Sequence, residues 1–295
     1  MTKQTVRKAV IPAAGFGTRF LPATMSQPKE MLPIVDTPTI QYVVEEAVES
    51  GITDILMVIG KSKRAIEEHF YRNFELEAEL EEKNKEEELK AVRRVSSLAN
   101  IHFVWQKELN GLGDAVSYGR SFVGDEPFAL LLGDTLIGTN KDKGPFTRQM
   151  IEVFEEHQES VVALERVDPD KVERYGIAGG KDLGNGVVEV EQLVEKPRKE
   201  DAPSNLAIAG RYVFKPEIFE YIERTGRGKN NEIQLTDAMV QMLADRAMYG
   251  LSIDGVRYDI GNKLDFLKTN VIFGLEREDF GERFRDFIKE MAAKL

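Results

Sequence analysis

Short apolar runs alternate with helical patterns through the first half of the chain, and this alternation constrains the fold more than any other feature. One run typical of a buried strand begins at Ala9, and three more lie at residues 55–59, 101–105 and 128–132. Residues 40–50, between the first two runs, have apolar side chains at helical spacing. Such alternation predicts parallel pairing, with helices on both faces of one sheet. Because ligands bind outside the carboxyl ends of such strands, polar residues directly after these runs are the first candidates for a site.

The first apolar run breaks into a glycine-rich loop that can hold phosphate. Gly15 and Gly17 lack a Cβ, so backbone N–H groups there can approach an anion closely. Arg19 adds a guanidinium group suited to phosphate oxygens, and Lys29 adds a second cation. The loop matches neither the Walker motif nor the dinucleotide motif, whose third glycine position is Phe20. We predict a nucleoside triphosphate site here, with a tight strand-to-helix turn and an exposed arginine as the alternative.

Two aspartates at possible strand ends are candidate metal ligands. Asp134 follows the apolar run 128–132 and a glycine, and Asp259 lies near the end of another possible strand. Mg²⁺ takes one or two carboxylates together with phosphate oxygens, so the pair could bind it. The alternative for Asp134 is an ordinary turn or N-cap aspartate.

Gln106 follows the strand expected at 101–105 and is a candidate for reading a base. Its amide offers a donor and an acceptor, which match the edge of a pyrimidine. Gly111, in the next loop, would let backbone groups approach the same base. An ordinary hairpin-like loop is the alternative.

Glu195 and Lys196 are candidates for binding a sugar phosphate. Adjacent strand residues point to opposite faces, so both reach one ligand only if the strand ends or bulges there. Pro197 favours such an end because it cannot continue the ladder. The carboxylate would accept sugar hydroxyl hydrogens and the ammonium would bind phosphate, with a surface ion pair as the alternative.

Two further segments are expected to elaborate one domain that spans residues 1–295. Eight glutamates between Glu75 and Glu88, with a thin apolar stripe, predict a helical hairpin inserted at residues 75–98 rather than a disordered linker. An aromatic and aliphatic stripe predicts C-terminal helices within 262–295 that pack on the core or on another subunit. The second half is richer in strands, which are expected at 161–165, 186–190, 206–214 and 250–256.

Composition excludes several classes of protein. The net charge of −11 argues against broad nucleic-acid binding, so phosphate ligands would need locally clustered cations. The chain has no cysteine, which excludes disulfides and thiolate sites and fits a cytoplasmic location. No apolar run approaches the roughly 20 residues of a membrane helix. The histidines have no metal-binding spacing, and no nucleophile elbow is present.

Ten sequence motifs, spread in order over nearly the whole chain, resemble those of a known protein family. They are Ala14–Arg19, Pro28–Pro33, Gln41–Glu46, Gly111–Gly113, Gly124–Pro127, Tyr175–Gly176, Val194–Pro197, Ala202–Ile208, Glu232–Asp237 and Asp259–Leu264. Together they resemble the sugar-1-phosphate nucleotidylyltransferases, most closely the bacterial-type UTP–glucose-1-phosphate uridylyltransferases. The resemblance implies a Rossmann-like α/β fold, with a mixed, mostly parallel central sheet flanked by helices. It also implies Mg²⁺ as a cofactor and a homo-oligomer, a dimer or a tetramer.

The resemblance also implies a role for each site residue. Those for the nucleotide are Ala13, Ala14 and Gly15 through backbone groups, Arg19 at the triphosphate, Lys29 near the reacting phosphorus, and Glu30, Gln106 and Gly111 around the uracil. Those for metal and sugar are Asp134 and Asp259 on Mg²⁺, Tyr175, Gly176, Glu195 and Asn205 on glucose, and Lys196 on its phosphate.

The resemblance implies that UTP and glucose 1-phosphate give UDP-glucose and pyrophosphate. Arg19, Lys29, Asp134 and Lys196 would be catalytic. The chain departs from the family at two positions that concern specificity. Met25 stands where the family often has lysine. Gly133–Asp134 stands where the family often has Pro-Asp, and it is more similar to the thymidylyltransferase relatives. The alternatives are a thymidylyl- or mixed-specificity transferase, and a catalytically inactive sugar-nucleotide sensor, which would be expected to lack some of the charged residues.

Overall fold

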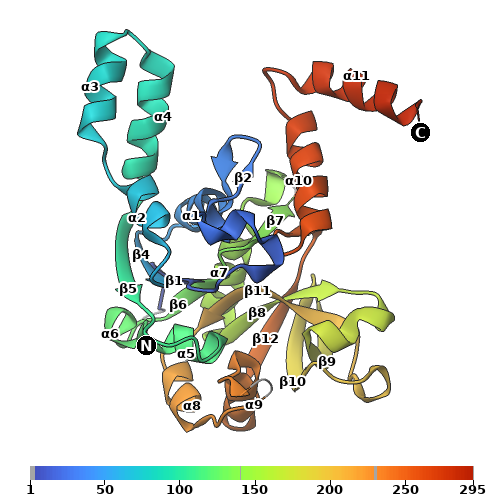
Figure 1. The fold of residues 1–295 in the computed structure, drawn as a ribbon. Helices are drawn as coiled ribbons and strands as arrows, with labels where there is room; N and C mark the ends of the chain where they lie inside the picture. Colours follow the sequence, from blue (N-terminus) through green and yellow to red (C-terminus); the bar gives the residue numbers. More distant parts are fainter. Residues whose placement is uncertain (1–3, 140, 229–230, 295) are drawn as a thin grey trace.

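A nine-stranded mixed sheet occupies the centre of the computed structural model, which describes residues 4–139, 141–228 and 231–294 (Figure 1). Its strands are β1 (Lys8–Ala13), β4 (Asp54–Ile59), β5 (Asn100–Trp105), β6 (Phe128–Leu131), β8 (Ser160–Arg166), β9 (Gly176–Gly184), β10 (Val187–Glu195), β11 (Leu206–Phe214) and β12 (Met248–Ser252). They lie in the order β5-β4-β1-β6-β11-β8-β12-β10-β9. The arrangement confirms the expected mixed α/β fold.

The four strands of the first half pair in parallel, as their apolar sequences predict. β1 pairs in parallel with β4 and β6, and β4 pairs in parallel with β5. β4 and β6 are buried almost throughout because helices cover both faces of this half of the sheet. The carboxyl ends of β1 and β5 therefore lie along one edge, where the glycine loop and Gln106 begin.

Parallel pairing is less dominant than expected in the second half. β11 is antiparallel to β6 and β8, and β10 is antiparallel to β9 and β12. The strand expected at 250–256 is two strands, because the chain turns after β12 and continues as β13 (Gly255–Asp259). β13 pairs with β7 (Thr135–Thr139) outside the main sheet. The sequence analysis expected neither β7 nor β9.

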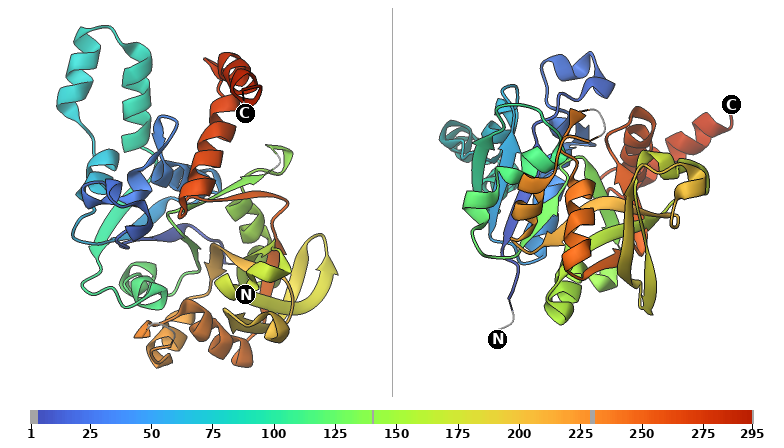
Figure 2. Two further views of the ribbon diagram at one scale, coloured as in Figure 1. Left: turned by 45° about the vertical axis from the view of Figure 1, so that its right-hand side comes forward. Right: turned by 90° about the horizontal axis from the view of Figure 1, so that it is seen from below.

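Helices cover both faces of the sheet over two apolar cores (Figure 2). Successive side chains of β1 point to opposite faces, so Ile11 enters one core and Val10 enters the other. The first core includes α1 (Thr39–Glu49) and α7 (Phe146–His157). The remaining elements around the sheet are α2 (Arg64–Phe70), α5 (Leu112–Ser117), α6 (Arg120–Val123), α8 (Ile218–Arg224), α9 (Leu235–Asp245), β2 (Pro33–Ile34) and β3 (Thr37–Pro38).

The predicted helical hairpin is confirmed. α3 (Phe74–Glu82) and α4 (Glu86–Ser96) project together from the sheet edge beside α2 (Figure 1). Glu77 of α3 is buried between Arg72 and Arg93, and hydrogen bonds from these guanidinium groups lower the pKa of Glu77 to about 2. The glutamate run therefore contributes one structural ion-pair cluster besides a solvated surface.

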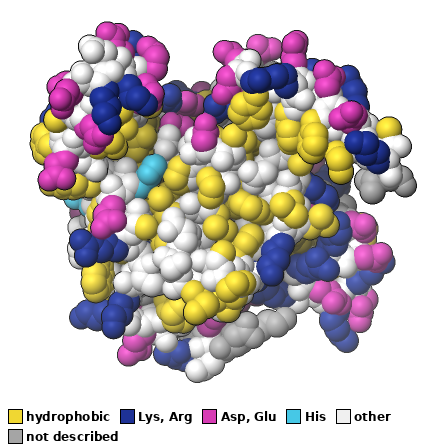
Figure 3. Space-filling view, turned by 45° about the horizontal axis from the view of Figure 1, so that its top comes forward, with side chains coloured by type: hydrophobic (Ala, Val, Ile, Leu, Met, Phe, Trp, Pro, Cys, Tyr) yellow, Lys and Arg dark blue, Asp and Glu magenta, His cyan; other side chains and the backbone are white. Residues whose placement is uncertain are grey.

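Two C-terminal helices follow the last strand, as predicted. α10 (Lys263–Leu275) stands on the body, and α11 (Gly281–Ala292) extends away from it (Figure 1). Exposed apolar side chains gather along these helices (Figure 3), and they are Leu264, Leu267, Ile272, Phe287 and Met291. Within the described ranges, no helix has the length and apolar character needed to cross a membrane. The assignment of 1–295 to one domain stays a prediction, and residues 1–3 and 295 lie outside the described residues.

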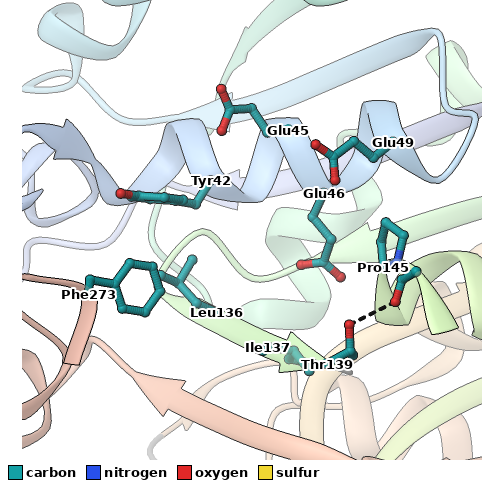
Figure 4. Close-up of a pocket in the computed structure, with 11 residues that line it drawn as sticks. Tyr42, Glu45, Glu46, Glu49, Leu136, Ile137, Thr139, Pro145 and Phe273 are labelled. Carbon is teal, nitrogen blue, oxygen red and sulfur yellow. Dashed lines mark hydrogen bonds between the residues drawn. The ribbon is translucent and has the colours of Figure 1, made fainter. Parts of the chain in front are cut away.

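A buried ion pair joins the sheet to α1. Arg211 of β11 is fully buried, and its Nη2 lies 2.7 Å from Oε2 of Glu46. Glu46 points from α1 toward β7 (Figure 4). The remaining guanidinium hydrogens go to the backbone carbonyls of Leu132, Gly210 and Thr135. Arg211 thus binds together the strand ends from which Asp134 projects.

We expect Arg211→Leu to lower the free energy of unfolding by about 3–5 kcal/mol, because it removes the cation of the largely buried Glu46 carboxylate and the donor to three carbonyls. Urea unfolding followed by circular dichroism measures the loss. Arg64→Ala is the matched control, since Arg64 is 84% exposed and pairs only with Glu68 among the described residues. The control should change stability by less than about 0.5 kcal/mol, and an equally small change in Arg211→Leu would contradict the structural role.

Candidate active site

The glycine loop after β1 is tightly folded against Lys29. Gly17 has φ +65°, and a Cβ there would lie 3.0 Å from the Cβ of Lys29. Residues other than glycine are strained at this φ, and Lys29 already fills the space that a Cβ would need. This position therefore needs glycine. Arg19 and Lys29 belong to two short 3₁₀ turns, Thr18–Phe20 directly after the loop and Lys29–Met31, which packs against Gly17.

A cavity of about 310 Å³, called here the base cavity, lies at the carboxyl ends of β1 and β5. It is lined by seven of the eight residues predicted for the nucleotide, all except Arg19. These seven are Ala13, Ala14, Gly15, Lys29, Glu30, Gln106 and Gly111. Glu232, which begins the motif Glu232–Asp237 but was given no site role, also lines it. The convergence expected from parallel strand ends is therefore present in the structure.

Lys29, which lines the base cavity, forms an ion pair with Asp134, which does not line it. Nζ of Lys29 lies 2.6 Å from Oδ2 of Asp134, and both side chains remain partly exposed. Burial opposes the charged form of Lys29, but the Asp134 and Glu30 carboxylates outweigh it and raise the pKa of Lys29. Burial likewise opposes ionisation of Asp134, yet Lys29 lowers the pKa of that carboxyl group. Both groups are therefore charged at neutral pH.

Glu30 is held by a second, fully buried cation. Nζ of Lys63 lies 2.7 Å from Oε2 of Glu30, and the two side chains are 2% and 1% exposed. Burial raises the pKa of the Glu30 carboxyl group, and the ammonium groups of Lys63 and Lys29 oppose this shift. The sequence analysis missed Lys63, although its place just beyond the end of β4 was a signal that could have identified it.

Gln106 is fixed in both its backbone and its side chain. Its backbone N–H donates to the carbonyl of Ile59 at 2.9 Å. Its side-chain Nε2 donates to Oδ2 of Asp114 at 2.7 Å. Asp114 lies in the first turn of α5 and was not among the site residues predicted from the sequence.

Asp134, Asp259 and Arg19 converge around Gly261. A Cβ on Gly261 would lie 2.9 Å from Oδ1 of Asp259, 3.3 Å from Oδ2 of Asp134 and 3.4 Å from Nη1 of Arg19. Arg19 also donates to the carbonyl of Gly261 at 3.3 Å. Two carboxylates thus face one small space, next to a cation suited to phosphate. Over the described residues, no group of three or more His, Cys, Asp or Glu side chains could hold a metal. Two carboxylates suit Mg²⁺, which takes its other ligands from phosphate and water.

The residues predicted for the sugar lie where β10 ends beside β9. Glu195 is the last residue of β10 and pairs with Gly176 of β9. Lys196 has φ +47°, which ends the strand, and its Nζ lies 2.9 Å from Oε1 of Glu195. The structure confirms the strand end that would bring both side chains to one side. The backbone N–H of Lys196 donates to the carbonyl of Tyr175 at 3.0 Å, which joins the predicted sugar residues.

Asn205 is not brought into this group. Its Nδ2 donates to the carbonyl of Val167 at 3.0 Å, and its Oδ1 accepts from Arg166 at 2.9 Å. It does not belong to the described residues that line either the base cavity or the larger cavity described next. Its assignment to glucose stays a prediction.

A second cavity of about 990 Å³, called here the basic cavity, lies on the other side of Asp259. Arg19, Tyr175 and Asp259 line it, and Figure 3 shows Lys and Arg side chains gathered beside the C-terminal helices. The sequence analysis selected only Arg19 among its cations, and the others are Arg166, Lys171, Arg174, Arg257 and Lys268. Arg257 is mostly buried and lies over the ring of Tyr175 at 5.4 Å.

The two cavities are connected by charged contacts. Lys29 of the base cavity pairs with Asp134, which faces Gly261 together with Asp259 and Arg19 of the basic cavity. The base cavity, the charged contacts and the basic cavity together suit a ligand that has an apolar or planar end and several phosphates. The arrangement suits electrostatic stabilisation of a phosphoryl or nucleotidyl group in transfer.

Comparison with known proteins agrees with this chemistry. A UTP–glucose-1-phosphate uridylyltransferase of Staphylococcus haemolyticus is 50% identical over 286 residues, which cover 97% of this chain and 98% of that protein. The enzyme of the same name from Bacillus subtilis is 49% identical over 289 residues, which cover 98% of each chain. The resemblance seen in the motifs is therefore confirmed.

Solved structures agree as well. A UDP-glucose pyrophosphorylase complexed with UDP-glucose has a TM-score of 0.85 and 41% identity, covering 92% of this chain and 100% of that one. A UTP-bound UGPase from Acinetobacter baumannii has a TM-score of 0.87 and 38% identity, covering 97% of this chain and 99% of that one. The family model described as nucleotidyl transferase matches residues 8–273. This chain belongs to the nucleotidyl transferase family.

Proposed function

We propose that the chain transfers the uridylyl group of UTP to glucose 1-phosphate, giving UDP-glucose and pyrophosphate. The observation that carries this proposal is the charged connection from the base cavity through Lys29, Asp134 and Asp259 to Arg19. The names of the relatives and the UTP and UDP-glucose bound in similar structures support the choice of substrates. All of the charged residues that an inactive sensor would be expected to lack are present.

The reaction needs positioning and charge more than it needs a base. A phosphate oxygen of glucose 1-phosphate attacks the α-phosphorus of UTP, and the bond from that phosphorus to the bridging oxygen breaks. The nucleophile is already an anion at neutral pH, so the main difficulty is the repulsion between two anions. Lys29 would neutralise the α-phosphate, Lys196 the sugar phosphate, and Arg19 the departing pyrophosphate.

Asp134 and Asp259 would hold Mg²⁺, since both carboxylates face the space at Gly261. Bound Mg²⁺ supplies positive charge that stabilises the charge developing on the phosphates. Ala13, Ala14, Gly15 and Gly111 would contact the nucleotide through the backbone, and Glu30 and Gln106 would contact the base. Tyr175, Gly176, Glu195 and Asn205 would bind the glucose hydroxyls.

We also assign the protein to the cytoplasm as a homo-oligomer, either a dimer or a tetramer. The absence of cysteine is compatible with a reducing compartment. The exposed apolar side chains of α10 and α11 support contact between subunits through the C-terminal helices.

Pyrophosphate release tests the substrates. We expect the purified protein with Mg²⁺ to release pyrophosphate fastest from UTP and glucose 1-phosphate. The comparison uses dTTP, CTP, ATP and GTP with the same sugar, and galactose 1-phosphate with UTP. Gln106 would read thymine much as it reads uracil, so a higher kcat/KM for dTTP would favour the thymidylyltransferase alternative. Absence of release from every pair would contradict catalysis.

Lys196→Ala tests the sugar phosphate contact. We expect the KM for glucose 1-phosphate to rise by about tenfold or more and kcat to fall, because a charge-assisted hydrogen bond to phosphate is lost. Steady-state kinetics at saturating UTP measure both parameters. Lys199→Ala is the matched control, since Lys199 is exposed and pairs with Asp170. Unchanged kinetics in Lys196→Ala would exclude the assigned role.

Asp134→Ala tests the metal assignment. We expect Mg²⁺-dependent turnover to fall by about 100-fold or more, since loss of one charge-stabilising group commonly costs 10²–10³ in kcat. Turnover is measured across a Mg²⁺ titration, with the melting temperature as a check on folding. Asp125→Ala, on an exposed turn, is the control. Turnover close to that of the unmodified protein at every Mg²⁺ concentration would remove Asp134 from the metal site.

A further inference from the structure

The amide of Gln106 is held by a carboxylate that lies behind it. Nε2 of Gln106 donates to Oδ2 of Asp114 at 2.7 Å. Gln106 lines the base cavity, whereas Asp114 is not one of the described residues that line it. Any effect of Asp114 on a bound base therefore passes through Gln106.

An ionised carboxylate fixes which end of an amide faces it. Carboxylate oxygens only accept hydrogen bonds, so the NH₂ end of Gln106 must face Asp114. The opposite orientation would place the amide oxygen against the carboxylate oxygens. Within the described part of the chain, Asp114 is the one hydrogen-bond partner of the Gln106 side chain. The amide oxygen and the second N–H are therefore free for a ligand.

The backbone on both sides of this contact is also fixed. Gln106 is anchored to Ile59 at the end of β4. On the other side, the N–H of Gly113 donates to the carbonyl of Ile233 at 2.9 Å, and the N–H of Ile233 donates to the carbonyl of Asn110 at 2.7 Å. Gly113 is packed so closely that a Cβ there would lie 2.8 Å from the Ile233 side chain. Both groups are therefore set before a ligand arrives.

The fixed amide presents its donor and acceptor in one order. Uracil offers a carbonyl oxygen at position 4 and an N–H at position 3, whereas cytosine offers an NH₂ and a bare ring nitrogen at these positions. We propose that Asp114 is a positioning residue that fixes the Gln106 amide to pair with uracil and to reject cytosine. Nε2 then donates to O4 of the base, and Oε1 accepts from N3–H. Thymine has the same edge, so the pair selects a 4-keto pyrimidine regardless of its methyl group.

This inference rests on the proposed function, and Asp114→Asn tests it. Asparagine can either accept from or donate to Gln106, so the amide gains the reversed orientation that suits cytosine. We expect the UTP:CTP ratio of kcat/KM to fall by about tenfold or more, since a hydrogen bond to a charged group is worth roughly one to two orders of magnitude. The KM for UTP should rise and that for CTP should fall, with the KM for glucose 1-phosphate and the melting temperature unchanged. Asp125→Asn is the matched control.

Calorimetric binding of UTP and CTP with Mg²⁺, without sugar phosphate, separates this inference from the proposed function. If the unmodified protein binds neither nucleotide, the proposed function fails. If it prefers UTP and Asp114→Asn keeps the same preference, only the role of Asp114 fails. Equal weakening of both nucleotides would also overturn it, because a purely structural residue would have that effect. Asp114→Ser removes the fixed acceptor with less bulk, and its UTP:CTP ratio decides the question if Asp114→Asn does not fold.

Discussion

The ion pair between Lys29 and Asp134 is the contact on which the rest of the site depends. It joins the turn at Lys29–Met31, which packs against the glycine loop, to the segment after β6. Lys29 lines the base cavity, and Asp134 is one of the two carboxylates that face Gly261. Each partner keeps the other charged despite burial. Neither charge is left uncompensated before substrate arrives, so the cost of holding a cation and an anion in a partly buried site is limited. Phosphate and Mg²⁺ would then compete for partners that are already in place.

The protein concentrates positive charge locally against an overall charge of −11. Half of the six cations of the basic cavity come from the end of β8 and the segment after it, namely Arg166, Lys171 and Arg174. The other three are Arg19 beside the glycine loop, Arg257 of β13 and Lys268 of α10. Cavity walls of low dielectric focus the field of such a cluster, which attracts phosphate esters without making the whole surface basic. Acidic side chains also line the cavity, and one of them, Glu165, forms an ion pair with Arg257 that fixes the position of this guanidinium group.

The parts of the fold that follow a simple period could be predicted, and so could the residues at the ends of those strands. β6 and all of β4 after Asp54 are apolar, and the Gly15 loop and Gln106 follow strands of the same parallel group. β9 was missed because its sequence combines glycines with charged residues, although its hairpin partner β10 follows after Asn185 and Gly186, which both have the positive φ of a tight turn. Lys63 and Arg211 were missed for a related reason: their partners lie 33 and 165 residues away along the chain. Asn205 shows the opposite limit, since a motif cannot reveal that neighbouring groups already satisfy a side chain.

Two polar side chains that line the base cavity, Glu30 and Gln106, are each fixed by a residue that does not line it. Lys63 holds Glu30, and Asp114 holds Gln106. A buried ion pair such as Glu30–Lys63 is seldom more stable than apolar residues of the same size, so stability alone does not account for it. Groups fixed in advance lose little conformational entropy when a ligand binds, and they leave a wrong base with unpaired polar partners. We therefore expect discrimination between pyrimidines to depend on residues that the base does not touch, because those residues decide which donors and acceptors the cavity presents.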